Sequence, residues 1–209
     1  MFVKICGIKT EEALAAADAN GADFVGFIFV KESHRYIEPA NAAVLTAKLH
    51  RAKTVGVFVN AGVEEVQRIS KQCNLSYVQL HGTESADYAK CIETPVIKAW
   101  RWGDNFSLEE ASRYPAELHI IDSYRPGGAA GGTGEVFRWR EAVDDLKAFQ
   151  KPFLVAGGIT ENNVFDALDT FHPAGIDVSG GLEIDREKSV EKIVSFLHRI
   201  NQWRDARHA

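Results

Sequence analysis

Cysteine is scarce in this sequence, and charge of neither sign is in large excess. The three cysteines, Cys6, Cys73 and Cys91, are odd in number, widely spaced and without a CxxC pair, so neither a disulfide framework nor a zinc site is indicated and we expect no metal. The net charge is −5, with basic residues scattered along the chain. This balance gives no basic field for nucleic acid or an anionic membrane, which leaves a small molecule as the expected partner.

Long apolar runs and linker-like segments are missing as well. The longest strongly apolar run, Phe24 to Val30, is far too short to span a bilayer, and the N-terminus has no basic region followed by an extended apolar one. We therefore expect a cytoplasmic protein with no membrane contact. No Pro/Ser-rich or charge-rich stretch divides the 209 residues, which predicts one domain over residues 1–209.

What the sequence does contain is an ordinary globular composition, with 45% hydrophobic and 25% charged residues and enough length for a substantial core. Short runs rich in Val, Ile and Phe recur along it and predict strands. These runs are Phe2 to Cys6, Phe24 to Phe29, Thr54 to Val59, Tyr77 to Leu80, Val96 to Ala99, Leu118 to Ile121, Phe153 to Ala156 and Gly175 to Val178.

Helical patterns lie between most of these runs. The clearest covers Lys188 to Trp203, where an apolar stripe stands opposite charged residues. Thr10, before two glutamates, is typical of a helix cap. The stretch Ser107 to Tyr114 is the weakest pattern, so we expect a short or missing helix between the fifth and sixth strands.

Strands that alternate with helices pair in parallel, because a short turn cannot return a strand parallel to its neighbour. An open sheet and a closed barrel both satisfy this rule. A regular spacing of roughly two dozen residues per unit favours an α/β fold of the compact, single (β/α)8 TIM-barrel type. The chemistry of such barrels lies at the carboxyl ends of the strands, where Cys6 and Asp122 stand. Lys4 shares a strand face with Cys6, and we expect its charge to favour the thiolate.

Glycines suggest the kind of ligand. Gly157-Gly158, Gly180-Gly181 and the loop Gly127 to Gly134, which includes Gly132, allow backbone amides to approach an anion closely. In TIM barrels a phosphate often lies by the seventh and eighth loops, where Gly157, Gly158, Ser179 and Gly180 occur. Each glycine pair by itself is as readily only a tight turn.

At these positions the sequence resembles the phosphoribosylanthranilate isomerase family. The similarity spans nearly the whole chain in order, and the opening motif together with the glycine loop is highly specific. The motifs are Lys4-Ile-Cys-Gly7, Ser33-His-Arg-Tyr36, Val55-Gly-Val-Phe-Val-Asn60, Val78-Gln-Leu-His-Gly82, Ile121-Asp-Ser123, Gly131-Gly-Thr-Gly134 with Phe137 and Trp139, and Asp177-Val-Ser179.

The resemblance implies a cofactor-free Amadori rearrangement of a phosphosugar, N-(5-phosphoribosyl)anthranilate, in tryptophan biosynthesis. Cys6 matches the family's general base and Asp122 its general acid. Arg35 matches the residue that pairs with the anthranilate carboxylate, and Asp177 a position near the sugar. Gly180 departs from the family pattern, which commonly has a serine there, so we expect altered phosphate affinity. A monomer and a homodimer are both compatible with the sequence.

Other interpretations stay open at this point. A pentose-phosphate epimerase needs paired aspartates or a metal cluster, a non-catalytic phosphosugar-binding barrel does not need both Cys6 and Asp122, and a redox sensor needs only Cys6. We interpret His81 as a turn histidine. Trp100 is as suited to packing over the thin fifth helix as to sheltering an aromatic ring.

Overall fold

Strands and helices alternate along the chain, and the structure, a computed structural model, describes residues 1–102, 106–123 and 139–207. The strands are β1 Phe2–Cys6, β2 Phe24–Ile28, β3 Lys53–Phe58, β4 Tyr77–Leu80, β5 Val96–Trp102, β6 Leu118–Ser123, β7 Phe153–Ala156 and β8 Gly175–Val178. The helices are α1 Glu11–Ala19, α2 Pro39–Thr46, α3 Val63–Gln72, α4 Ala86–Lys90, α5 Leu108–Arg113, α6 Trp139–Ala148, α7 Val164–Phe171 and α8 Val190–Ala206. Between β8 and α8 lie a short 3-10 helix, η1 Gly180–Leu182, and an antiparallel pair of strands, β9 Glu183–Ile184 and β10 Glu187–Lys188.

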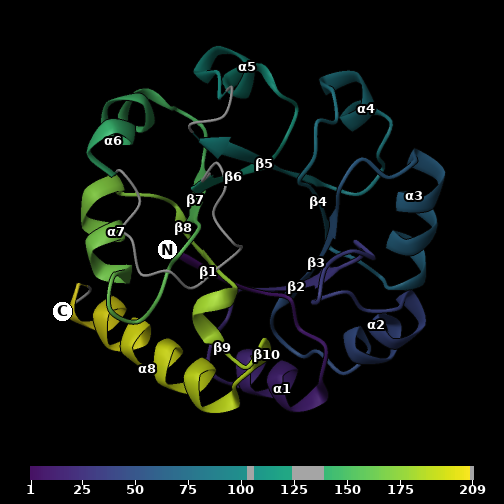
Figure 1. Ribbon diagram of the computed structural model, residues 1–209, viewed down its shortest axis with the longest axis horizontal. Coiled ribbons are helices and arrows are strands. Elements are labelled where there is room, and N and C mark those ends of the chain that lie inside the picture. Colours follow the sequence, from purple (N-terminus) through teal and green to yellow (C-terminus); the bar gives the residue numbers. More distant parts are fainter. Residues whose placement is uncertain (103–105, 124–138, 208–209) are drawn as a thin grey trace.

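The strands β1 to β8 form a closed parallel barrel in sequence order, and the helices surround it (Figure 1). Closure comes from the pairing of β1 with β8, which sets Lys4 opposite Asp177. The predicted TIM barrel is confirmed, and the open sheet is excluded. In the described part of the chain no helix is both long and apolar enough to cross a membrane.

Alternate residues along the strands fill the barrel interior. This inner core consists of Phe24, Val55, Ile97, Ala99, Leu118, Ile120, Leu154 and Ala156. Strand residues of the opposite parity, such as Ile5, Val25 and Val78, pack outward with the helices into a larger core. Because Leu118 and Ile120 point inward, the alternation along β6 directs Asp122 inward as well.

The helical ring is thin beside β5. α5 has six residues, which confirms the expected short helix between β5 and β6, and α4, with five, is shorter still. Trp100 packs in this sector, edge-on to Tyr114 with 5.3 Å between ring centroids and stacked on His119 at 6.3 Å. Trp100 therefore belongs to the outer packing.

Polar caps set the starts of two helices. The Thr10 side chain accepts a hydrogen bond from the Ala13 N–H, as predicted for a cap of α1. α8 begins later than the pattern indicated because Lys188 belongs to β10. Ser189 is the cap of α8, accepting from the Lys192 N–H.

Candidate active site

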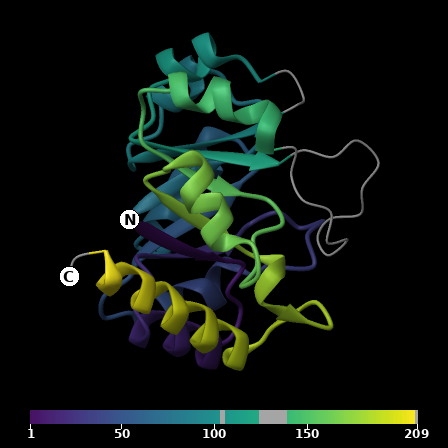
Figure 2. The same cartoon turned by 90° about the vertical axis from the view of Figure 1, so that its left-hand side faces the viewer.

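The predicted site residues come together at the carboxyl ends of the barrel strands. This end lies away from the two chain termini, which Figure 2 shows at the opposite end of the barrel. Cys6 ends β1, Arg35 follows β2, Asp122 lies in β6, Gly157 and Gly158 follow β7, Asp177 lies in β8, and Ser179 and Gly180 follow it. Gly132 lies outside the described residues.

Cys6 lies within a chain of polar contacts. Cys6 is 6% exposed. The Lys4 side chain, beside it on the inward face of β1, is fully buried. Lys4 Nζ donates to Asp177 Oδ1 at 3.0 Å. Ser179 Oγ donates to the Cys6 carbonyl oxygen at 3.0 Å. The thiol is therefore held beside a buried ion pair that joins the first and last barrel strands.

The charge state of this thiol differs from the sequence-based expectation. Burial raises the pKa of the Cys6 thiol, and the nearby Lys4 charge lowers it by less. Burial also opposes the Lys4 charge, but Asp177 and Cys6 outweigh it and raise the lysine pKa. Lys4 therefore favours the thiolate, as expected, but burial, together with the Asp177 charge, outweighs this effect and keeps the pKa of the thiol above its usual value.

Asp122 faces His81 across the barrel mouth. His81 Nε2 lies 3.4 Å from Asp122 Oδ2, and the two side chains are 22% and 29% exposed. Gln79 Nε2 lies 3.0 Å from His81 Nδ1, so the other ring nitrogen, Nε2, is the one that faces the carboxyl group. The interpretation of His81 as only a turn histidine was incomplete. The sequence did contain a signal for this placement. His81 comes two residues after Gln79 and directly after β4, a strand that ends at the site, so the two side chains lie on the same face.

Arg35 lies against a carboxylate that the sequence analysis did not single out. Arg35 Nε donates to Glu183 Oε1 at 2.5 Å and Arg35 Nη2 to Oε2 at 2.9 Å. Lys188 Nζ reaches Glu183 Oε1 at 2.5 Å and the Ser179 carbonyl at 3.3 Å. Burial opposes the charge of Glu183, but Arg35 and Lys188 outweigh it and lower its pKa to about 2. The sequence signal was a charged segment, 183–188, that follows the glycine pair after the eighth strand.

The glycine loops after β7 and β8 contact one another. Gly157 and Gly158 have φ of +85° and +66°, a conformation that favours glycine. A Cβ on Gly181 would lie 2.1 Å from the Ile159 carbonyl oxygen, so only glycine allows this approach of the two loops. Among the described residues, none accepts a hydrogen bond from the backbone N–H of Gly157, Gly158, Gly180 or Gly181. These N–H groups are available to an anion.

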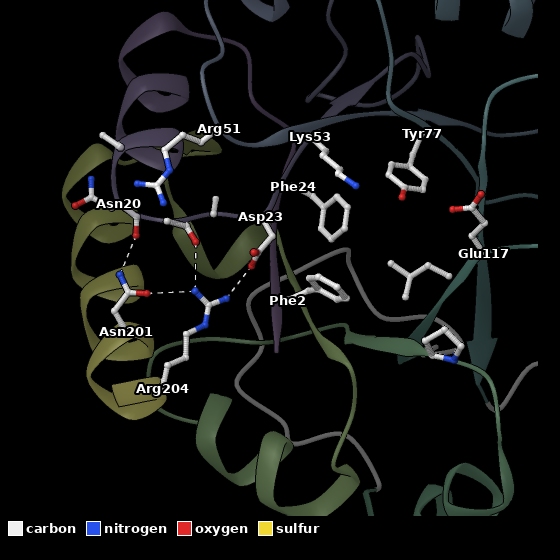
Figure 3. Close-up of a pocket in the computed structure, with 15 residues that line it drawn as sticks. Phe2, Asn20, Asp23, Phe24, Arg51, Lys53, Tyr77, Glu117, Asn201 and Arg204 are labelled. Atoms are coloured by element: carbon white, nitrogen blue, oxygen red, sulfur yellow. Dashed lines mark hydrogen bonds and ion pairs between the residues drawn. The ribbon is translucent and has the colours of Figure 1, made fainter. Parts of the chain in front are cut away.

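A cavity of about 640 Å3 opens at the other end of the barrel (Figure 3). Phe2, Phe24 and Tyr77 line it beside Lys53. Arg204 at its edge donates to the Met1 carbonyl at 2.8 Å and to Asp23 Oδ2 at 2.7 Å. The packed inner core separates this cavity from Cys6 and Asp122. The Arg204 contacts at its edge connect α8 to the residues that directly precede β1 and β2.

The fold and the site define a class of protein. Cys6 and Asp122 belong to strands three positions apart around the closed barrel, so they flank its mouth from different sides. A thiol and a carboxyl group placed in this way can move protons on a small molecule, while glycine N–H groups hold an anion. In the described residues, no group of three His, Cys, Asp or Glu side chains is arranged to hold a metal ion. These features indicate the class of (β/α)8 barrels, with a candidate acid–base site at the carboxyl ends of the strands.

Comparison with known proteins identifies the family within this class. The family model described as N-(5'-phosphoribosyl)anthranilate (PRA) isomerase matches residues 3–199, and the chain belongs to this family. It is 42% identical over 204 residues to N-(5'-phosphoribosyl)anthranilate isomerase of Geobacter sulfurreducens, covering 96% of this chain and 98% of the relative.

Solved structures agree with this assignment. The chain is similar to phosphoribosyl anthranilate isomerase from Thermotoga maritima, with a TM-score of 0.87 and 31% identity over 97% of this chain and 99% of that one. Another similar structure is phosphoribosyl anthranilate isomerase in complex with reduced 1-(o-carboxyphenylamino)-1-deoxyribulose 5-phosphate, with a TM-score of 0.83 and 30% identity over 97% and 99% of the two chains.

Proposed function

We propose that this protein catalyses the Amadori rearrangement of N-(5-phosphoribosyl)anthranilate to 1-(2-carboxyphenylamino)-1-deoxyribulose 5-phosphate, an aldose–ketose isomerisation in tryptophan biosynthesis that uses no cofactor. One observation carries the proposal: Cys6 and Asp122 both end on the inward face of the barrel mouth, in a chain of this family. Relatives named as this isomerase cover nearly the whole chain.

In the proposed mechanism Asp122 is the general acid and Cys6 the general base. Asp122 gives a proton to the furanose ring oxygen as the bond from this oxygen to C1 breaks, and the nitrogen lone pair forms the Schiff base. The Cys6 thiolate then removes the C2 proton, and the electron pair of that bond forms the enolamine. Proton return to C1 and proton loss from the C2 hydroxyl complete the ketone.

The buried surroundings of Cys6 affect how the base is formed. Since burial raises its pKa, the resting thiol carries a proton that must leave before C2 is deprotonated. The charges of Lys4 and Lys188 both lower the pKa of this thiol and so favour the thiolate when it forms. A redox sensor has a low-pKa, exposed cysteine, and Cys6 has neither property.

The two ends of the substrate fit two different groups of residues. We assign the phosphate to the loops of Gly157, Gly158, Ser179 and Gly180, whose glycine N–H groups are uncommitted among the described residues. The family resemblance adds Gly132 to this group. Gly180 retains its backbone N–H where the family pattern commonly has a serine, so we expect the phosphate affinity to change and phosphate binding to persist.

The other assignments concern the sugar and the aromatic ring. Arg35 binds the anthranilate carboxylate through its guanidinium group. Asp177 acts near the sugar and anchors Lys4 beneath the thiol. We also propose a monomer or a homodimer. One solved structure is described as monomers generated from the dimeric isomerase of Thermotoga maritima. Light scattering on this protein decides between the two states.

The experiment that tests the function follows anthranilate fluorescence. Phosphoribosylanthranilate is generated in situ, purified protein is added, and the fluorescence decay is compared with spontaneous hydrolysis. We expect rapid decay with the wild type. We expect that Cys6→Ala abolishes it and that Cys6→Ser or Asp122→Asn lowers the turnover rate by about 10²- to 10⁴-fold.

The matched control is Cys91→Ala, the same change at an exposed cysteine, which is expected to keep full activity. Circular dichroism verifies that each variant is folded. Wild-type protein that binds a product analogue without turnover would instead indicate a non-catalytic binding barrel. Near-normal rates in either site variant would refute the assigned acid or base.

A further inference from the structure

Glu183 occupies one edge of the Arg35 guanidinium. The Nε and Nη2 atoms donate to the two carboxylate oxygens at 2.5 and 2.9 Å, a side-on, two-point pairing. Among the described residues, none accepts a hydrogen bond from Arg35 Nη1. The guanidinium therefore has one edge held by the protein and a second edge, Nη1 with the remaining Nη2 hydrogen, that forms no hydrogen bond to the described residues on a side chain that is 16% exposed.

The carboxylate that holds Arg35 is itself held firmly. The Glu183 side chain is 9% exposed, and Lys188 Nζ, on a side chain that is 4% exposed, lies 2.5 Å from its Oε1. Lys192 Nζ donates to the Glu183 backbone carbonyl at 2.8 Å. A long side chain without such contacts would lose its orientation among several rotamers.

The aliphatic part of Arg35 is equally constrained. A Cβ on Gly7 would lie 2.7 Å from Arg35 Cδ, so the arginine stem passes directly over the residue that follows Cys6. Arg35 and Lys188 carry two positive charges against one negative charge on Glu183. Together these three side chains therefore carry a net positive charge beside the end of β1, which suits an anionic group of the ligand.

We propose that Glu183 is a positioning residue: it binds one edge of Arg35 so that the other edge faces the aromatic carboxylate of the substrate and selects for ligands that carry this group. The inference rests on the proposed function. Without Glu183 the guanidinium gains rotamers and no longer presents two parallel N–H groups, so carboxylate recognition weakens although the local positive charge increases.

The test compares two ligands with the full-length protein. The first is reduced 1-(o-carboxyphenylamino)-1-deoxyribulose 5-phosphate, and the second is the same compound without its ring carboxyl group. Dissociation constants are measured by calorimetry for the wild type and for Glu183→Gln. We expect Glu183→Gln to raise the dissociation constant of the ligand with the carboxyl group by about tenfold. The dissociation constant of the second ligand should stay unchanged.

Two further variants make the result specific. Glu187→Gln removes the same charge from the same hairpin at an exposed residue that pairs with Lys9, and we expect no change in the ratio of the two dissociation constants. Arg35→Lys removes the planar guanidinium with its two hydrogen-bonding edges. In this background, Glu183→Gln should have no further effect on the ratio of the two dissociation constants. If Glu183→Gln does not fold, Glu183→Asp, which withdraws the carboxylate by one methylene, takes its place.

Several results would overturn the inference. An equal loss of affinity for both ligands would show that Glu183 has only a structural role. Unchanged or tighter binding of the ligand with the carboxyl group would show that the charge at Arg35 matters more than its orientation. Wild-type turnover is measured in parallel. Active wild type with an unchanged ratio defeats only the role of Glu183, whereas inactive wild type that binds neither ligand defeats the proposed function itself.

Discussion

At Cys6, burial and neighbouring charges act on one thiol in opposite directions. Burial and Asp177 raise its pKa, while Lys4 and Lys188 lower it, and the balance favours the protonated form. Asp177 has two effects, since it stabilises the buried Lys4 charge and at the same time reduces the effect of that charge on the thiol. Reactivity at Cys6 therefore depends on the Asp177 carboxylate, which pairs with Lys4, the neighbour of the thiol, and neutralises its charge.

Removal of the Asp177 charge tests this balance. In Asp177→Asn, Lys4 acts on the thiol without a counter-charge, so the pKa of Cys6 is expected to fall. The pH dependence of Cys6 alkylation by iodoacetamide, with peptide mass spectrometry to separate Cys6 from the exposed Cys91, should move to lower pH. Asp169→Asn, at an exposed carboxylate, is the control. A curve at unchanged or higher pH would contradict the expectation.

At the scale of elements, one carboxylate connects α1 to the segment that enters β3. Asp18 accepts hydrogen bonds from the backbone N–H groups of His50, Arg51 and Ala52 at 2.9, 3.0 and 2.7 Å. Burial opposes the Asp18 charge, but these three bonds outweigh burial and lower its pKa. The Asp18 carboxylate satisfies backbone N–H groups that form no hydrogen bond within a helix or strand. It thereby sets where β3 begins.

We expect Asp18→Asn to lower the free energy of unfolding by about 2 kcal/mol at neutral pH, because an amide satisfies fewer of these N–H groups. Urea denaturation measures the change. Since the folded-state pKa is lowered, the stabilisation is present above the ordinary carboxyl pKa and is lost as pH falls through the folded value. The difference from wild type should therefore shrink in acid. Asp87→Asn, at an exposed site, is the control, and an unchanged midpoint for Asp18→Asn would refute the role.

The elements differ in how far the sequence predicts them. β1, β4, β7 and β8 have the predicted bounds, because strands buried on both faces read as short apolar runs. β5 and β6 extend further than predicted, through a pairing that sets Arg101 opposite Asp122. That extension depends on the partner strand. The pair β9–β10 was not predicted, since strands of two residues show no periodicity.

At the scale of the whole molecule, a buried histidine makes stability depend on pH. His119 lies in β6, and its side chain, on the outward face of the barrel, is fully buried. Its Nδ1 accepts a hydrogen bond from Trp100 Nε1 at 2.9 Å, so this nitrogen carries no proton. Burial, followed by the Lys151 charge, lowers its pKa from 6.5 to about 4. Between these two pH values the unfolded chain binds a proton that the folded protein does not.

Stability is therefore expected to fall as pH drops from 6.5 toward 4. Relative to His119→Asn, which does not titrate, the wild type should lose roughly 1–2 kcal/mol between about pH 7 and pH 5. Urea denaturation of both proteins across this range measures the difference. A constant difference between the two proteins would show that His119 does not change its proton binding on unfolding.

The sequence by itself determined the alternation of strands and helices, and with it the barrel and the strand ends on which Cys6 and Asp122 stand. These features follow from local periodicity and chain order, which are readable without coordinates. Only the tertiary structure decided which charges meet. Lys4 and Asp177 are 173 residues apart in the chain and Arg35 and Glu183 are 148 apart. The protonation of the Cys6 thiol depends on these neighbours and on its burial, because desolvation and Coulomb energies depend on distances in space that no local pattern encodes.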